Sequence, residues 1–282
     1  MGGQIMAVLG SGNAQKMRTQ LVDGVAHYRL PLGEAEIALN ERIGSFLKLT
    51  FEGEINCVHC DRKTRKSFNQ GYCYPCFQRL AQCDSCIVSP EKCHYFEGTC
   101  REPQWGETHC MIDHIVYLSN TSKVKVGITR GSQVPTRWID QGAVQALPIF
   151  RVSNRLQSGL VESIFKQHVA DKTSWQAMLK NQPEPMDLHA ERDRLSAECA
   201  PDIAHLRESF GEDAIEPLAA EDVHITFPVE QYPAKVKAFN LDKSPTAEGT
   251  LQGIKGQYLI FDTGVINIRK YGGYKLTVSD EG

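Results

Sequence analysis

The sequence predicts an α+β protein with a cysteine-rich segment, a small mixed sheet flanked by helices, and an antiparallel β unit towards its C-terminal end. Nine of the ten cysteines lie between Cys57 and Cys110, in a segment too polar to form a core of its own. Between residues 114 and 169, apolar runs of strand type alternate with helical spacing. From residue 249 onward, glycines separate short strands. The predicted segments are an N-terminal β segment (1–52), a cysteine-rich segment (53–110), a core (111–180), an acidic helical or linker segment (181–222) and a C-terminal β unit (223–282).

The composition is that of an ordinary globular protein, since 41% of the 282 residues are hydrophobic and 23% are charged. No run approaches the roughly 20 apolar residues that a membrane-spanning helix needs. The first residues lack the basic and apolar regions of a secretory signal, so we expect a cytoplasmic protein. The net charge of -3 excludes a uniformly positive surface, and contacts with nucleic acid would have to use local basic patches.

The N-terminal β segment predicts short strands joined by turns. Apolar and polar side chains alternate with a period near two at residues 26–30, 35–39 and 45–51. This alternation is typical of strands that bury one face. We therefore expect these runs to form a small antiparallel sheet.

Two pairs of cysteines with the spacing Cys-x-x-Cys predict a zinc site. Cys57 and Cys60 form the first pair and Cys73 and Cys76 the second, with twelve residues between the pairs. Each pair lets two sulfurs converge from a tight turn, so that four thiolates can surround one Zn²⁺ at about 2.3 Å. In a reducing compartment, such clustering is typical of metal binding rather than of disulfides. A closed four-thiolate site has no open coordination position, so the ion would be structural.

A second set of cysteines follows, and its spacing is less specific. Cys83 and Cys86 form a third Cys-x-x-Cys pair, and Cys93 and Cys100 follow at intervals of seven residues. Four thiolates suit a second zinc ion, which we predict, but the same spacing would also suit an iron–sulfur cluster. Spare donors that could replace a thiolate are His59, His94, His109 and Cys110.

The stretch between the first two cysteine pairs is basic. Lys63, Arg65 and Lys66 lie there within four residues. Positive side chains on a metal-held loop are suited to phosphate contacts, so we predict that these three residues bind nucleic acid. A solvated charged face would explain them equally well.

The core predicts the order strand, strand, helix, strand, helix. Apolar runs at 114–118 and 124–128 flank a polar turn, which indicates a hairpin. Pro135 and Gly142 suit the start and the end of a short helix, and residues 147–152 follow as a third strand. The final helix is indicated by apolar residues at 160, 161, 164, 165 and 169.

In its order of elements and its short motifs, this core resembles the GIY-YIG endonuclease superfamily. The residues Ile-Val-Tyr at 115–117 correspond to the first motif and Lys-Val-Gly at 125–127 to the second. Arg137 corresponds to the arginine of the helix, and Glu162 to the metal-binding glutamate. The resemblance covers about 60 residues, and it implies a small mixed sheet with flanking helices and the cleavage of a phosphodiester bond.

The resemblance implies roles for particular residues. Tyr117 would orient or deprotonate the attacking water, Arg137 would bind the phosphate, and Glu162 would hold a Mg²⁺ ion together with waters. Lys125 stands where catalytic members usually have tyrosine, and residue 115 is isoleucine where they have the first glycine. The implied catalytic residues are therefore Tyr117, Lys125, Arg137 and Glu162, and the sequence leaves open whether catalysis is retained.

The last two segments differ in composition. Residues 181–222 are acidic and contain four prolines, which predicts partly helical surface or a linker. The C-terminal β unit interleaves basic and aromatic residues on short strands, a composition that can stack bases and contact phosphates. We therefore predict that Arg269 and Lys270 bind nucleic acid, although aromatic residues at this spacing are more typical of a packed core.

Over its full length, the order of the cysteine-rich segment, the core and the tail at 249–270 resembles the bacterial domain-of-unknown-function family 2797, whose name carries no mechanism. The leading hypothesis is a zinc-containing nucleic-acid-binding protein, which as an enzyme would be a Mg²⁺-dependent endonuclease acting on structured DNA or RNA. The alternative is a non-catalytic module that binds nucleic acid or a protein partner. A third hypothesis takes the second cysteine set as the iron–sulfur site of a redox or RNA-modifying enzyme.

Overall fold

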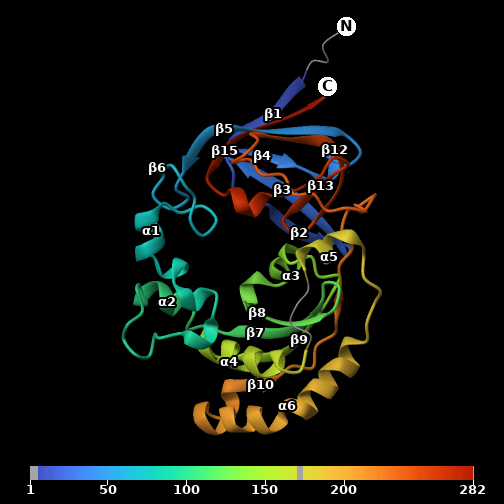
Figure 1. The fold of residues 1–282 in the computed structure, drawn as a ribbon. Helices are drawn as coiled ribbons and strands as arrows, with labels where there is room; N and C mark the ends of the chain where they lie inside the picture. Colours follow the sequence, from blue (N-terminus) through green and yellow to red (C-terminus); the bar gives the residue numbers. More distant parts are fainter. Residues whose placement is uncertain (1–5, 170–173, 282) are drawn as a thin grey trace.

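The computed structural model describes residues 6–169 and 174–281 and has the α+β fold that the sequence predicts. A few residues of three predicted segments lie outside the described residues, in the segments 1–52, 111–180 and 223–282. Figure 1 shows a large sheet at one end of the molecule, a smaller sheet with helices at the other, and the cysteine-rich segment along one side. Within the described residues, no helix combines the length and the apolarity that a membrane-spanning helix needs.

The large sheet joins the two ends of the chain. Its strand order is β1-β15-β5-β12-β13-β14, with β6 paired to β5. The strands are β1 (Met6–Asn13), β5 (Phe46–Asn56), β6 (Lys63–Thr64), β12 (Thr246–Lys255), β13 (Tyr258–Phe261), β14 (Val265–Asn267) and β15 (Tyr274–Glu281). Because β15 pairs with β1 on one side and with β5 on the other, strands from the N-terminal and C-terminal segments share one sheet.

One prediction about the N-terminal strands is wrong. β2 (Arg18–Val22), β3 (Val25–Leu32) and β4 (Ala35–Ala38) form a three-stranded antiparallel sheet, but β5, which contains the run at 45–51, does not join it. Instead, β5 pairs with β12 and β15, where Leu47 and Leu49 are fully buried in the main core. An alternating pattern shows which face of a strand is buried, but not which strand it pairs with.

The core contains the predicted order of elements. They are β7 (His114–Asn120), β8 (Val124–Arg130), α3 (Thr136–Asp140), β9 (Gln145–Val152) and α4 (Arg155–Lys166). β7 lies between β8 and β9, and two later strands, β10 (Ile215–Pro217) and β11 (Val223–His224), pair with β9. All of these pairs are antiparallel where the structure describes them, although a mixed sheet was expected. The strands β8 and β9 run in the same direction, but β7 lies between them and separates them. They therefore do not pair, and the connection through α3 crosses over β7.

The acidic segment is more regular than the sequence suggests. It contains α6 (Leu188–Phe210), a helix of 23 residues. Leu195, Cys199 and Ile203 recur along one face and are buried with Phe165 of α4 in the second apolar cluster. α6 therefore covers the core sheet instead of serving as a linker. α5 (Trp175–Lys180) precedes it.

The cysteine-rich segment has little regular structure. It contains α1 (Tyr74–Arg79), α2 (Pro103–His109) and the 3-10 helices η2 (Ala81–Cys83), η3 (Ser85–Ile87) and η4 (Pro90–Lys92). The segment begins where β5 ends and finishes where β7 begins, so it connects the large sheet to the core sheet (Figure 1). The remaining 3-10 helices are η1 (Asn40–Arg42), η5 (Gly131–Gln133), η6 (Glu212–Ala214) and η7 (Ile268–Tyr271).

The position of β15 inside the large sheet predicts that its buried side chains are important for stability. Leu276 is fully buried, so Leu276→Ala should lower the free energy of unfolding by about 2–5 kcal/mol in urea denaturation, because it leaves a cavity. Lys275→Ala, a change at the exposed neighbouring position, is the control and should alter it by less than about 0.5 kcal/mol. Equal effects of the two changes would contradict this account of β15.

Candidate metal centre and basic cleft

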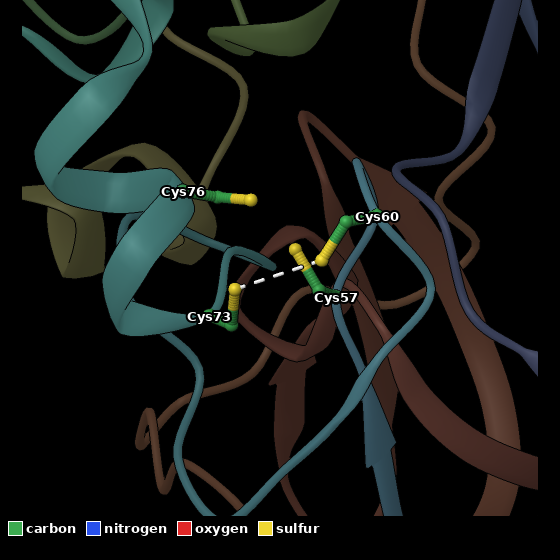
Figure 2. A group of neighbouring side chains, drawn as sticks. All are labelled: Cys57, Cys60, Cys73 and Cys76. Carbon is green, nitrogen blue, oxygen red and sulfur yellow. Dashed lines mark hydrogen bonds between the residues drawn. The ribbon is translucent and has the colours of Figure 1, made fainter.

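The first four predicted ligands converge. Figure 2 shows the side chains of Cys57, Cys60, Cys73 and Cys76 pointing toward one another, and their sulfur atoms all lie within 4.8 Å of one another. The Sγ atoms of Cys60 and Cys73 are 3.7 Å apart. A tetrahedron with metal–sulfur bonds of 2.3 Å separates its sulfurs by about 3.8 Å. These four cysteines can therefore hold a metal ion such as zinc.

Local backbone structure brings the four sulfurs together. After the first pair the chain turns sharply, because Asp61 adopts a φ of +57° and donates its N–H to the Cys57 carbonyl at 2.9 Å. Cys73 caps the N-terminus of α1, which places Cys76 in the first helical turn. Pro75 also lies in this turn, where its missing N–H removes no helical hydrogen bond.

Backbone N–H groups favour the thiolate form of one of these cysteines, which is the form that binds a metal. Burial would raise the pKa of the Cys57 thiol, but hydrogen bonds from the N–H groups of Cys73, Cys60 and His59 lower it to about 6. Burial and hydrogen bonds with the three neighbouring thiols raise the pKa of Cys76 to about 12. Because four thiolates repel one another, a cation is needed to hold all of them deprotonated.

The structure divides the second predicted set. Cys83 packs in a buried cluster with three of the first four cysteines, Cys57, Cys73 and Cys76. In contrast, Cys86, Cys93 and Cys100 line a separate small cavity. Between η2 and η3 the backbone of Asp84 is extended, and its carboxylate accepts a hydrogen bond from the N–H of Ser85 at 2.6 Å. On either side of this turn, Cys83 lies in the buried cluster and Cys86 lines the small cavity. Cys110, a spare donor in the sequence analysis, lines the small cavity as well.

A large cleft of about 1050 Å³ lies where the large sheet, the cysteine-rich segment and the core meet. Figure 1 shows the large sheet at the top, the cysteine-rich segment at the left and the core sheet below. The basic residues that line the cleft are Lys16, Arg130, Arg137, Arg155, Lys166 and Arg269, and the acidic ones are Asp61, Asp140 and Glu162. The lining is therefore positive overall, although the chain as a whole carries a net charge of -3.

Two of the four predicted catalytic residues, Arg137 and Glu162, line this cleft. Lys125 is half-buried, pairs with Ser119 across the hairpin, and is not among the cleft residues. Arg137 on α3 and Glu162 on α4 thus line the same cleft, whereas Lys125 of the second motif does not line it.

The third, Tyr117, is buried directly beside the cleft. Its hydroxyl donates a hydrogen bond to the Oε1 atom of Gln141, a cleft residue, at 2.6 Å. A Cβ atom on Gly127 would lie 2.7 Å from the Tyr117 hydroxyl. Because Gly127, at the end of the second motif, has no side chain, the phenol of Tyr117 in the first motif has room to pack there.

Burial perturbs both the phenol and the carboxylate of this group. Burial raises the pKa of Tyr117 to about 12, while Arg137 lowers it and Glu162 raises it. Burial also raises the pKa of Glu162, which Lys166, Arg137 and Arg155 lower. The Nζ atom of Lys166 is 3.2 Å from Oε2 of Glu162. At neutral pH, Tyr117 is thus a protonated phenol, and Glu162 is a largely buried acid surrounded by cations.

The predicted nucleic-acid residues of the C-terminal unit differ in position. Arg269 lines the cleft and donates a hydrogen bond from Nε to Oε1 of Gln70, at 2.6 Å, which links this unit to the cysteine-rich segment. Lys270 is exposed, and its ammonium lies 5.2 Å from the centre of the Tyr271 ring.

The basic residues between the first two cysteine pairs are exposed and lie outside the cleft lining. Lys63 forms an ion pair with Glu54 at 2.8 Å. The Lys66 ammonium lies 5.3 Å from the centre of the Phe68 ring, and Arg65 is exposed beside it. These three residues form an outer basic surface next to the metal centre.

The order of segments matches a known protein family. A family model described as a protein of unknown function (DUF2797) matches residues 44–276. The chain belongs to the DUF2797 family. The matched DUF2797 region contains both cysteine sets and all the predicted catalytic and nucleic-acid-binding residues. No curated protein and no solved structure gives a significant match.

The geometry of the first four cysteines predicts that they act as one unit. Cys73→Ser should lose the ion, because three thiolates cannot close the tetrahedron, and trypsin should then cut near residues 62–66. Elemental analysis and limited proteolysis measure the two effects. Cys199→Ser, which changes a buried thiol on α6, is the control and should keep the ion. A Cys73→Ser protein with the metal content and trypsin resistance of the wild type would show that packing holds this segment.

Proposed function

We propose that this DUF2797 protein is a zinc-containing protein that binds nucleic acid in the basic cleft. The observation that carries the proposal is that basic side chains from three separate segments line one cleft, which also contains Arg137 and Glu162. Phosphate backbones are polyanions that release counterions when they bind clustered Lys and Arg side chains. A positive cleft on a chain with a net charge of -3 would direct such a ligand to one place.

A zinc ribbon formed by the first four cysteines would give one wall of the cleft its shape. Cys57, Val58, His59 and Asp61, from the first cysteine pair and its turn, line the cleft, and Arg269 is hydrogen-bonded to Gln70 at its edge. In this proposal the ion has no catalytic role, because four thiolates leave no position for water or substrate. The outer surface formed by Lys63, Arg65 and Lys66 would extend the contact with phosphates beyond the cleft.

The catalytic form of the proposal is a GIY-YIG-like endonuclease acting on structured DNA or RNA. Glu162 would hold a Mg²⁺ ion, which supplies Lewis-acid stabilisation of the oxygens on the reacting phosphorus. Arg137 would bind the phosphate and offset the negative charge that develops in the transition state. Tyr117, which is protonated at neutral pH and donates its hydrogen bond to Gln141, would orient the attacking water by accepting a hydrogen bond from it rather than by removing its proton.

One contact favours the non-catalytic form, in which the core only binds. Glu162 has a cationic partner in Lys166, four residues further along α4, and such a pair needs no metal ion. Lys125, at the position of the usual catalytic tyrosine, does not line the cleft. Binding would then depend on Arg137 and Arg269 and would not require Glu162.

Binding is tested by fluorescence anisotropy with labelled branched DNA and hairpin RNA over a range of salt concentrations. Arg137→Ala combined with Arg269→Ala should weaken binding and reduce the slope of log K against log salt by about one for each lost phosphate contact. The control, Lys235→Ala with Lys237→Ala, removes two exposed charges outside the cleft lining and should leave the slope unchanged. Equal losses in both proteins would point to non-specific attraction.

Catalysis is tested by Mg²⁺-dependent nicking of duplex, branched and single-stranded DNA and RNA. Glu162→Gln should abolish nicking and leave binding nearly intact, because the amide keeps the shape but loses the charge that would hold the ion. Glu208→Gln, at an exposed position on α6, is the matched control and should cleave normally. If neither the wild type nor Lys125→Tyr cleaves any substrate, the endonuclease hypothesis fails and the binding module remains.

A further inference from the structure

We propose that Cys86, Cys93, Cys100 and Cys110 form a second four-thiolate site for Zn²⁺, with Cys110 taking the place that spacing assigns to Cys83. These four cysteines line one cavity of about 10 Å³, which has room for about one water-sized sphere. The proposal concerns the metal content of the protein and does not depend on the function of the cleft.

The fold explains how Cys110 reaches the other three. Cys86 lies in η3, Cys93 ends η4, and Cys100 precedes α2. Cys110 follows α2 directly and donates its N–H to the carbonyl of Gly106 at 2.7 Å. A Cβ atom on Gly106 would lie 3.6 Å from the Sγ of Cys100, so α2 packs against the loop that carries Cys100.

Packing separates Cys83 from these four cysteines. Cys83 lies in a buried cluster with Cys57, Cys73 and Cys76 of the first set, and it does not line the cavity that the other four cysteines share. The two sets of thiols therefore lie on either side of the turn at Asp84.

Two other donors compete for Cys86, since the donor atoms of Asp84, Cys86 and His94 lie within 4.8 Å of one another. However, the Asp84 carboxylate is 2.8 Å from Nε of Arg101. The Nδ1 atom of His94 is 2.7 Å from the Thr99 hydroxyl. The other ring nitrogen of His94, Nε2, is 3.4 Å from the Asp84 carboxylate. Both nitrogens of His94 and the carboxylate of Asp84 thus have partners in the same loop, and we assign the two residues to the support of the loop.

Ion binding would draw the four thiols together. In the part of the chain that the structure describes, they are not grouped within 4.8 Å of one another as the first set is. Cys93 and Cys100 are half-buried and lie outside helices and strands, so ion binding would turn their side chains toward Cys86 and Cys110. The cavity has room for about one water-sized sphere, which suits a single zinc ion better than several irons with bridging sulfides.

The site would also support the helix that carries Glu162. The N–H of Arg155, the first residue of α4, donates to the carbonyl of Cys110 at 2.8 Å, and its Nε donates to the carbonyl of Cys86 at 3.4 Å. A Cβ atom on Gly159 would lie within 2.6 Å of the backbone of η4, so α4 and this loop are in direct contact. An ion that orders the loop therefore orders the start of α4.

Elemental analysis of the purified full-length protein tests the ligand set, because two cysteines of the same segment should behave differently. The wild type should contain two zinc ions per chain, Cys110→Ser one, and Cys83→Ser two, since only Cys110 is a ligand. Cys83→Ser is the matched control, because it makes the same atomic change at another buried cysteine. Hydrogen exchange should rise around residues 86–110 and 155–159 in Cys110→Ser alone.

X-ray absorption at the zinc edge of the unmodified protein decides the matter if Cys110→Ser fails to fold. It should show a shell of sulfur only, at about 2.3 Å, for both ions. The proposal is overturned by a single zinc ion per chain, by nitrogen or oxygen ligands at the second ion, or by iron with labile sulfide. It is equally overturned if Cys110→Ser keeps both ions or if Cys83→Ser loses one.

Discussion

The clustering of cysteine side chains in one segment is the constraint on which the arrangement of this protein depends. Between residues 57 and 110, the buried apolar side chains are those of Leu80, Ala81, Pro90 and six cysteines. Such a segment buries little apolar surface, and a metal ion held by the four clustered cysteines would stabilise it. Because the segment connects the large sheet to the core sheet and lines the cleft between them, its folding would also shape the cleft.

Several basic side chains of the cleft lie close to one another and are partly buried. Arg137 lies close enough to disfavour the charged forms of both Arg155 and Arg269, whose pKa values are lowered first by burial and then by this repulsion. Cations that are gathered in this way and partly removed from water are costly unless an anion offsets them. Phosphates of a bound nucleic acid would offset them, whereas the acids Asp140 and Glu162 do so only in part.

The two metal centres would have separate tasks within one segment. The first centre would hold the loop next to Arg269, at the wall of the cleft that belongs to the large sheet. The proposed second centre would lie against α4, the helix that carries Glu162. Damage to either centre would therefore change the cleft from a different side.

Features that depend on neighbours in sequence were predictable here. The sequence spacing of four cysteines was enough to predict that their sulfurs converge, namely Cys57, Cys60, Cys73 and Cys76. Tight turns and the start of a helix bring each pair together locally. The order of strands and helices in the core was also predictable, because periodicity reports which face of each element is buried. The tertiary structure alone decided that β5 pairs with β15 and that Cys110 rather than Cys83 lines the cavity beside Cys86. These relationships depend on how distant parts of the chain pack, and local spacing carries no information about packing partners.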